Sequence, residues 1–262
     1  AVITSGTPVI TGFSPEERVA LGKQFIDVGI AEEHAVALAS GMARNGAKPV
    51  YFVFSSFIQR TYDQLSQDLC LNNNPAVILV FSASLNGFND ATHLGRFDIP
   101  MMSNIPNLVY LAPTCREEYL AMLEWGLNQK DHPVAIRVPG GFGCEELWSC
   151  GCAVTPDFSA LNTFKTDIKG QDVALLALGA FYRLGKEVAE ELAKDGVNAT
   201  LINPRFITGL DEAALNGLKE NHRLVVTLED GQIEGGFGEK VDRFYADSAI
   251  KVLNYGGKKE FT

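Results

Sequence analysis

Continuous apolar runs of strand length recur along the chain and constrain its fold more than any other feature. Four of them lie before residue 140, at residues 50–54, 76–81, 108–112 and 134–138. Helical patterns separate the runs, and one of them places apolar residues on a single helix face at Ile58, Tyr62, Leu65 and Leu69. Apolar runs that alternate with helices are typical of a parallel sheet covered by helices on both faces. The sequence therefore predicts an α/β protein.

The regular pattern breaks between about residues 144 and 170, where Trp148, Pro156 and several cysteines stand among polar residues. The pattern then resumes, with apolar runs at 173–178, 199–202, 224–228 and 250–253. Helical patterns lie between them at 184–193 and 210–218. We therefore predict two doubly wound domains with mostly parallel sheets, at residues 1–145 and 170–262, joined by a linker at 146–169.

Length and charge limit the class of protein. A chain of 262 residues has room for one large or two medium α/β domains. The net charge of −10 argues against a nucleic-acid or anionic-membrane partner. No apolar run reaches the length of a membrane span, and the first residues lack a basic region followed by an apolar core. We therefore expect a cytoplasmic protein.

The five cysteines are odd in number, and most of them lie in the middle third of the chain: Cys70, Cys115, Cys144, Cys150 and Cys152. This arrangement argues against a disulfide framework. The last three are close together, but they lack the paired C-x2-C spacing of a zinc site. We predict that the cysteines are reduced thiols and bind no metal. The alternative is a metal site at Cys144, Cys150 and Cys152.

The first chemically suggestive segment spans residues 25–35. A short apolar run ends at Gly29, and an Ala-rich helix follows with Glu32, Glu33 and His34 in its first turn. A junction between strand and helix brings backbone N–H groups and side chains together at the edge of a sheet. The carboxylates therefore form a candidate site, although acidic residues also favour a helix N-terminus for electrostatic reasons alone.

Two aromatic residues mark the second junction. Phe54 ends an apolar run, Phe57 opens the next helix, and Arg60 follows one turn later. Two aromatic rings at the end of a strand can form a flat wall for a heteroaromatic ring. The alternative is that both rings fill the core, with Ser55 or Ser56 capping the helix.

The third junction is a long polar loop at residues 82–98, in which His93 stands among Asn, Asp and Thr. Long loops at strand ends often carry function, while a lone histidine is often structural. All three junctions follow strands of one parallel sheet, so we expect them to open on the same edge. The chain has no G-x-G-x-x-G fingerprint, Walker A sequence or serine nucleophile elbow.

Taken together, these residues resemble the transketolase-like thiamine-diphosphate enzymes, close to 1-deoxy-D-xylulose-5-phosphate synthases and split transketolases. The matching segments follow one another over nearly the whole chain, at residues 27–35, 57–64, 92–98, 111–113, 137–139 and 252–256. The resemblance implies a pyrimidine-binding domain followed by a smaller transketolase C-terminal domain.

The resemblance also implies a missing partner. The diphosphate-binding domain of such enzymes carries a Gly-Asp-Gly metal motif, and this chain contains none. We therefore expect thiamine diphosphate to be shared with a diphosphate-binding N-terminal-type chain, which holds Mg²⁺ or another divalent ion. The assembly would be a homodimer or a heterotetramer, active only when both kinds of chain are present.

Within the resemblance, Glu32 is the acid that shares a proton with the aminopyrimidine of the cofactor. Phe57, with Phe54 beside it, forms the pyrimidine pocket, and Arg60 braces its rim. His93 matches a histidine that contacts oxygen atoms of the substrate, where it would stabilise developing charge or move protons.

The chain departs from the synthase pattern at two basic positions, which are Ser82 and Gly140 here. The loss of two charge-assisted bonds to a phosphate favours two-carbon ketol transfer between sugars or sugar derivatives over synthase activity. Arg96, Arg137 or the partner chain would then contact any substrate anion. The alternatives are a synthase, a 2-oxoacid dehydrogenase β-type subunit, or a non-catalytic partner subunit.

The second domain carries no predicted catalytic cluster. Residues 229–238 combine acidic residues with a Gly-Gly-Phe-Gly sequence and predict a loop that enters a helix. The resemblance assigns this loop to packing and dimer contacts. His132 and His222 are predicted to be structural or exposed to solvent.

Overall fold

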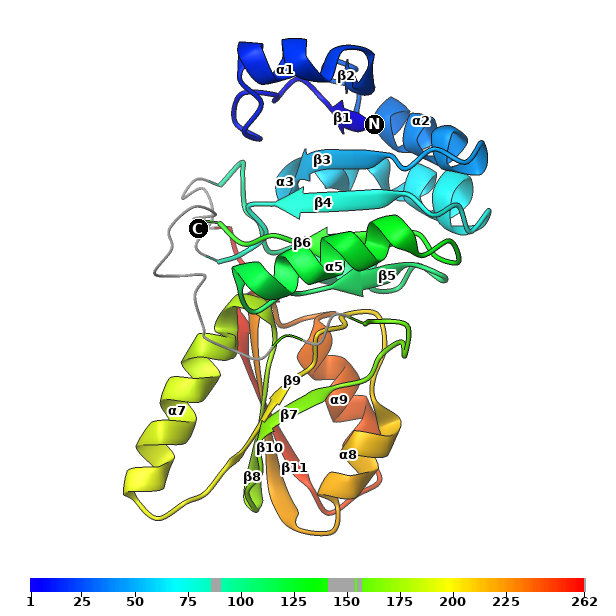
Figure 1. Cartoon of the computed structure of the whole chain (residues 1–262). Helices are drawn as coiled ribbons and strands as arrows, with labels where there is room; N and C mark the ends of the chain where they lie inside the picture. Colours follow the sequence, from blue (N-terminus) through cyan, green and yellow to red (C-terminus); the bar gives the residue numbers. More distant parts are fainter. Residues whose placement is uncertain (86–90, 141–153, 155–156, 262) are drawn as a thin grey trace.

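The computed structural model describes residues 1–85, 91–140, 154 and 157–261, and two β-sheets organise them. Sheet A has the strand order β2-β1-β3-β4-β6-β5, and sheet B has the order β11-β10-β8-β9-β7. The two sheets lie one above the other in Figure 1, with helices beside each. The predicted fold class is confirmed, because both sheets are mostly parallel and each is covered by helices.

Every strand pair of sheet A is parallel. Its strands are β1 (Val2–Thr4), β2 (Phe25–Asp27), β3 (Val50–Phe54), β4 (Val77–Phe81), β5 (Val109–Leu111) and β6 (Val134–Arg137). Four of them coincide with the predicted apolar runs. The N-terminal strand β1 was not predicted, because three residues are too few to show a period.

Sheet B contains β7 (Lys165–Ile168), β8 (Asp172–Ala177), β9 (Thr200–Asn203), β10 (His222–Gln232) and β11 (Lys251–Gly257). Only β7 runs antiparallel to its neighbour, β9. This strand lies inside the segment that was predicted to be a linker. It is an edge strand with mostly exposed side chains, so its sequence lacks the apolar run that marks a buried strand.

Helices fill the connections of sheet A. They are α1 (Pro15–Leu21), α2 (Glu32–Arg44), α3 (Ser55–Ile58), α4 (Asp98–Met102) and α5 (Arg116–Asn128). A 3₁₀ turn over Gln59–Thr61 and a π-helix over Gln64–Cys70 continue α3, where a regular α-helix was expected. The N-terminus of α1 has a complete capping box between Ser14 and Glu17, which satisfies two backbone N–H groups.

The two faces of sheet A explain why its strands are apolar at every position. On β4, Ile78 and Val80 pack in one cluster that includes α2, whereas Val77 and Leu79 pack in a second cluster that includes α5. All four side chains are at most 1% exposed. Burial on both faces removes the alternation between apolar and polar residues that a half-exposed strand would show.

Sheet B is covered in the same way. Helix α7 (Tyr182–Lys194) packs on one face, while α8 (Glu212–Leu218) and α9 (Phe237–Tyr245) pack on the other. The cluster that contains α8 and α9 also contains residues of sheet A. The two sheets therefore share one hydrophobic core.

Backbone hydrogen bonds also join the two domains. Leu111 of β5 forms an antiparallel bridge with Phe206, which follows β9. The Ala112 N–H donates to the Arg205 carbonyl at 2.8 Å, and the Ile207 N–H donates to the Tyr110 carbonyl at 2.8 Å. The outer edge of β5 is therefore paired with the second domain.

Within the described part of the chain, no helix combines the length and the hydropathy needed to span a membrane.

Candidate functional site

The three predicted junctions meet at one edge of sheet A. Strands β2, β3 and β4 run parallel, so the segments that follow Asp27, Phe54 and Phe81 leave the sheet at the same side. The prediction of a common edge is confirmed. One detail differs, because β1 lies between β2 and β3 and adds Thr4 and Ser5 to this edge.

A tight turn sets the start of α2. The Asp27 carboxylate oxygen Oδ1 accepts hydrogen bonds from the backbone N–H of Gly6 at 2.8 Å and of Gly29 at 3.1 Å. Gly29 has a φ of 71°, a left-handed conformation that glycine adopts at little cost. The chain then enters α2 at Glu32, which places Glu32 and Glu33 in the first turn, where the helix dipole favours negative charge.

The Glu32 carboxyl is buried, with 3% of the side chain exposed. Arg60 Nη1 lies 2.9 Å from Glu32 Oε2, and Arg60 Nε lies 3.5 Å from Glu33 Oε1. The Arg60 contact is an ion pair without hydrogen-bond geometry, so no group among the described residues donates a hydrogen bond to Glu32 Oε2. The Arg60 charge compensates this carboxylate, and the missing hydrogen bond leaves Oε2 able to accept one from a ligand group.

Sequence reasoning missed two polar side chains beside this carboxyl. Tyr51 of β3 is fully buried, and its hydroxyl shares a hydrogen bond of 3.0 Å with Ser5 Oγ. Burial raises the pKa of Tyr51 above its ordinary value, and the charge of nearby Glu32 raises it further. A tyrosine within an apolar strand run was the available signal, because a buried phenol needs a hydrogen-bond partner.

An aromatic row lies across the second and third junctions. The ring centres of Phe54 and Phe57 are 5.6 Å apart, and those of Phe57 and His93 are 5.5 Å apart. Thr92 Oγ1 shares a hydrogen bond of 2.7 Å with His93 Nδ1. Because α3 continues into the turn that carries Arg60, the aromatic row and the Glu32–Arg60 ion pair belong to one locality.

The structure corrects the expectation that Arg137 could bind a substrate anion. Its side chain is 2% exposed, and its guanidinium is enclosed by two carboxylates. Arg137 Nε donates to Asp98 Oδ2 at 2.7 Å, and Nη1 donates to Asp230 Oδ1. Burial alone would lower the pKa of Arg137, but the charges of Asp230 and Asp98 raise it above its ordinary value. This arginine is occupied by structural contacts.

Arg96 differs from Arg137. It is 6% exposed, and its Nε and Nη2 atoms are buried without a hydrogen-bond partner among the described residues. The guanidinium lies 5.7 Å from the centre of the Phe97 ring. The preceding residue, Gly95, packs against Ser82, because a Cβ at Gly95 would come within 1.8 Å of the Ser82 carbonyl oxygen. Arg96 therefore lies beside the loop that lacks the expected basic residue.

In the second domain, the predicted helix-entry loop at residues 229–238 is only partly confirmed, because residues 229–232 belong to β10 and residues 233–236 alone form the loop before α9. Glu229 contacts the start of that helix. Its carboxylate accepts hydrogen bonds from the N–H groups of Phe237 at 2.9 Å and of Gly238 at 2.8 Å, at the start of α9. Burial raises the pKa of Glu229 to about 7 and that of Asp230 to about 6. His222 is structural, because its ring contacts Thr200 Oγ1 and the Leu218 carbonyl.

The cysteines give no metal site within the described residues, where no cluster of metal-ligating side chains occurs. Cys70 and Cys115 are buried free thiols. Cys144, Cys150 and Cys152 lie outside the described residues.

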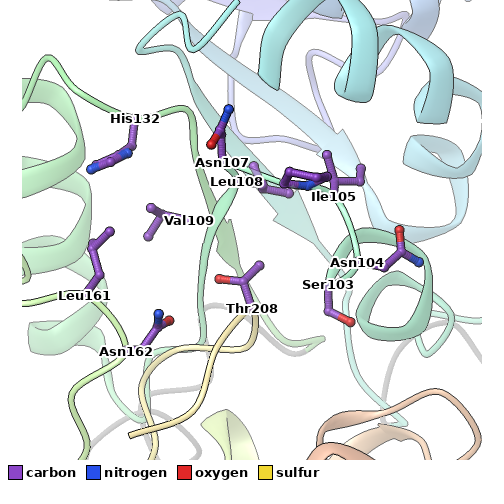
Figure 2. Close-up of a pocket in the computed structure, with 11 residues that line it drawn as sticks. Ser103, Asn104, Ile105, Asn107, Leu108, Val109, His132, Leu161, Asn162 and Thr208 are labelled. Atoms are coloured by element: carbon purple, nitrogen blue, oxygen red, sulfur yellow. The ribbon is translucent and has the colours of Figure 1, made fainter. Parts of the chain in front are cut away.

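A separate cavity of about 370 Å³ lies near the amino ends of β5 and β6, where the two domains meet. Figure 2 shows Asn107, His132, Asn162 and Thr208 around it. The candidate site lies at the carboxyl edge of the sheet, so this cavity is not part of it. The described lining contains no lysine, arginine, aspartate or glutamate, and we assign the cavity no function.

Comparison with known protein families shows the family to which this chain belongs. Residues 9–141 match the family described as the transketolase pyrimidine-binding domain, and residues 163–257 match the transketolase C-terminal domain. The chain belongs to the transketolase family. The resemblance inferred from the sequence is therefore confirmed.

Curated relatives of this chain include 1-deoxy-D-xylulose-5-phosphate synthases. The protein from Acaryochloris marina is 41% identical over 226 residues, which cover 84% of this chain and 34% of the relative. The protein from Halothermothrix orenii is 37% identical over 259 residues, which cover 97% of this chain and 40% of the relative. The chain thus spans little more than a third of the length of these relatives.

Two solved structures share the transketolase fold. A split-gene transketolase, described as an inactive beta4 tetramer, superposes with a TM-score of 0.81 at 22% identity, covering 99% of this chain and 83% of the other. A transketolase mutant from Pichia stipitis in complex with fructose 6-phosphate superposes with a TM-score of 0.69 at 15% identity, covering 87% and 35%. At these identities the match supports the fold.

Proposed function

We propose that this chain is the C-terminal component of a two-chain, thiamine-diphosphate-dependent transketolase, which transfers a two-carbon ketol unit between sugars or sugar derivatives. The buried Glu32 carboxyl carries the proposal, because its Oε2 atom lacks a hydrogen-bond donor among the described residues. The aromatic row beside it and the transketolase domains around it support the same assignment.

The residues at this edge fit the aminopyrimidine of thiamine diphosphate. We propose that the Glu32 carboxyl shares a proton with a ring nitrogen, and that the partly buried Phe57 ring, with the buried Phe54 ring behind it, provides apolar surface. When bound, the cofactor supplies a nucleophilic carbon that the protein side chains lack. Arg60 holds the Glu32 carboxyl in place, and His93 is our candidate for contact with substrate oxygen atoms.

The surface near Glu32 fits a partner chain. Ile30 is 79% exposed only two residues before Glu32, and Val19 is 82% exposed. Val9 and Ile10, each 67% exposed, add to the apolar surface of the N-terminal part. We propose that a diphosphate-binding chain covers this surface, completes the cofactor site and provides the divalent ion. The match to a split-gene transketolase supports this arrangement.

Arg96 is our candidate for binding an anionic group of the substrate. Its buried Nε and Nη2 atoms carry no hydrogen bond among the described residues. An anion at this position would satisfy them with charge-assisted bonds, each worth about 1.5–3 kcal/mol. Ser82 and Gly140 offer no positive charge, so Arg96 takes over that role in the proposed site.

Reconstitution tests the proposal. The chain is mixed with a transketolase chain that carries the Gly-Asp-Gly motif, thiamine diphosphate and Mg²⁺, and ketol transfer between sugar phosphates is followed. We expect no turnover by this chain alone and turnover by the pair. Calorimetry should also find weak binding of thiamine diphosphate to this chain alone. Tight binding, or a pair that remains inactive with all substrates tried, would contradict the proposal.

The second candidate function is 1-deoxy-D-xylulose-5-phosphate synthase activity, which the 37–41% identity to curated synthases favours. Product analysis separates the two functions. With pyruvate as donor, a synthase releases carbon dioxide and forms a deoxy sugar phosphate, whereas a ketol transferase leaves pyruvate unchanged. We expect unchanged pyruvate, because the synthase arginines are replaced at Ser82 and Gly140.

A further inference from the structure

We propose that the C-terminal domain positions His93 through Asp230, which makes Asp230 a positioning residue for the reaction. The role of His93 in catalysis rests on the proposed function. The positioning itself rests on buried contacts that join the end of β10 to the segment that carries His93.

The segment from His93 to the start of α4 needs external anchors. Residues 91–96 form turns and bends without a helix or strand ladder, so their backbone carbonyls depend on donors from other segments. Arg137 Nη2 donates to the Gly95 carbonyl at 3.2 Å, and the Gln232 N–H donates to the Arg96 carbonyl at 3.1 Å. Both anchored carbonyls lie within three residues of His93.

The end of β10 controls both anchors. Gln232 belongs to this strand and supplies the second one directly. Asp230 supports the first, because its carboxylate accepts from Arg137 Nη1 and its backbone carbonyl accepts from Nη2 at 3.3 Å. Asp98 Oδ2 accepts from Arg137 Nε at 2.7 Å. Arg137 is thus held between a carboxylate of the second domain and the segment after His93.

Packing at this contact leaves little freedom. Asp98, Ile99 and Asp230 are fully buried. A Cβ added at Gly231 would lie 2.8 Å from Ile99 Cδ1, so the backbone of β10 lies against the first turn of α4. Groups packed at this density pass a displacement on to their neighbours. A change at Asp230 should therefore move the His93 segment.

The ring centres of His93 and Phe57 are 5.5 Å apart, so a movement of the His93 segment would change the geometry of the candidate site. A displacement of about 1 Å in a catalytic group can lower a rate about 10²-fold. The C-terminal domain, which contributes none of the predicted catalytic residues, would in this way set the geometry of the reaction.

Histidine NMR on the isolated chain tests the positioning without cofactor or partner. The chain has four histidines, at positions 34, 93, 132 and 222. The ring signals of His93 are identified by their loss in His93→Ala. In Asp230→Asn, which preserves the shape of the side chain, we expect the His93 signals to shift while those of His34 and His132 stay in place. Unchanged His93 signals in a folded Asp230→Asn protein would overturn the proposal.

Asp211→Asn is the matched control. Asp211 is also a carboxylate of the second domain, and it accepts hydrogen bonds from the N–H groups of Ala214 and Phe164. Its replacement should destabilise the cap of α8 and leave the His93 signals unchanged. If both variants shift His93 equally, a general loosening of the domain explains the effect, and the proposal is wrong.

Gly231→Ala provides a second route if Asp230→Asn fails to fold. The added methyl group presses on Ile99 from the β10 side, so it should shift the His93 signals without removing any charge. Gly217→Ala is its control, because a Cβ there meets nothing within 4 Å. Equal spectra for Gly231→Ala and Gly217→Ala would count against the proposal.

A double-mutant cycle in the assembled enzyme tests the link to catalysis. We expect Asp230→Asn to lower kcat about tenfold with little change in KM, and to have no further effect in the His93→Ala background. The same tenfold loss in both backgrounds would show that Asp230 acts by another route. If the pair shows no thiamine-dependent activity at all, the proposed function fails, whereas the NMR comparison still decides the positioning.

Discussion

Glu32 and Glu33 are neighbours in the first turn of α2, but their environments differ. The Glu32 side chain is 3% exposed, and the Glu33 side chain is 40% exposed. Arg60 contacts both carboxylates, at 2.9 Å and 3.5 Å. A charge at this helix N-terminus would be favourable at either position, so burial distinguishes the candidate catalytic acid from a carboxylate that supports the helix.

The first prediction compares these two residues. Glu32→Ala should lower turnover of the reconstituted pair by about 10² or more, because a positioned acid is removed, while cofactor binding weakens much less. Glu33→Ala should retain turnover within about twofold of the unmodified pair. Steady-state kinetics and calorimetry supply the measurements. Equal losses in the two variants would mean that the role belongs to neither residue alone.

The second prediction concerns Arg96. Inorganic phosphate should raise the melting temperature of the isolated chain by about 2–4 °C for each kcal/mol of binding energy, because it satisfies a buried guanidinium. Arg96→Met should lose this response and melt at an equal or higher temperature without phosphate, since it removes a buried charge whose Nε and Nη2 atoms have no partner in the part of the chain that the structure describes.

Arg44→Met is the control for Arg96, because Arg44 is an exposed arginine in the last turn of α2. It should keep the phosphate response. Differential scanning calorimetry at several phosphate concentrations makes the comparison. A response that survives in Arg96→Met would place the phosphate at another position.

At the scale of secondary-structure elements, the sequence predicted what periodicity can show. Burial of β4 on both faces leaves an apolar residue at every position from Val77 to Val80, so that strand was evident. Strand β7 was missed because its side chains are mostly exposed. The π-helix at Gln64–Cys70 was taken for an α-helix, because both geometries bury Leu65 and Leu69 on one side.

For the candidate site, the sequence predicted which residues meet at one edge, because parallel strands end together. It did not predict that Arg137 is enclosed by Asp98 and Asp230. These carboxylates lie 39 and 93 residues away along the chain, and no local pattern reports such a distant contact. The surroundings of a single arginine likewise depend on tertiary packing. The sequence therefore could not show that Arg137 is paired with carboxylates while Arg96 keeps buried atoms without a hydrogen bond among the described residues.

The turn before α2 carries the third prediction. Gly29 adopts a φ of 71°, and a Cβ at this position meets no atom within 4 Å, so only backbone strain opposes a side chain. Gly29→Ala should therefore lower the free energy of unfolding by about 1–2 kcal/mol. Gly41→Ala, in the middle of α2 and also without contacts, should raise it by about 0.5–1 kcal/mol. Urea unfolding measures both variants, and a stabilised Gly29→Ala would refute the account of this turn.

At the scale of the whole molecule, one hydrophobic cluster extends across both sheets, and the buried ion cluster around Arg137 lies at their junction. Tyr110 completes that cluster, with its hydroxyl donating to Asp98. Burial raises the pKa of Asp230 to about 6 and that of Glu229 to about 7. These carboxyl groups take up protons when the chain folds, so they make folding depend on pH.

The fourth prediction follows from the sign of this effect. A carboxyl whose pKa is higher in the folded state favours folding at low pH, and that contribution is lost as the pH rises from about 4.5 to 7. For Glu229 the loss amounts to about 3 kcal/mol. Between pH 5 and pH 7.5, Glu229→Gln should therefore lose less stability than the unmodified chain. The exposed Glu239→Gln should behave like the unmodified chain, and identical urea-unfolding profiles for all three would contradict the prediction.

The bridge between Leu111 and Phe206 has a consequence for the chain in the cell and in the test tube. Without the second domain, the outer side of β5 would present bare amide and carbonyl groups in a straight row, a template onto which another copy can add. A fragment that stops near residue 140 should therefore aggregate at concentrations at which the intact chain remains in solution. Beyond its part in the proposed reaction, the second domain covers the edge of β5 and so prevents this strand from pairing with another copy of the chain.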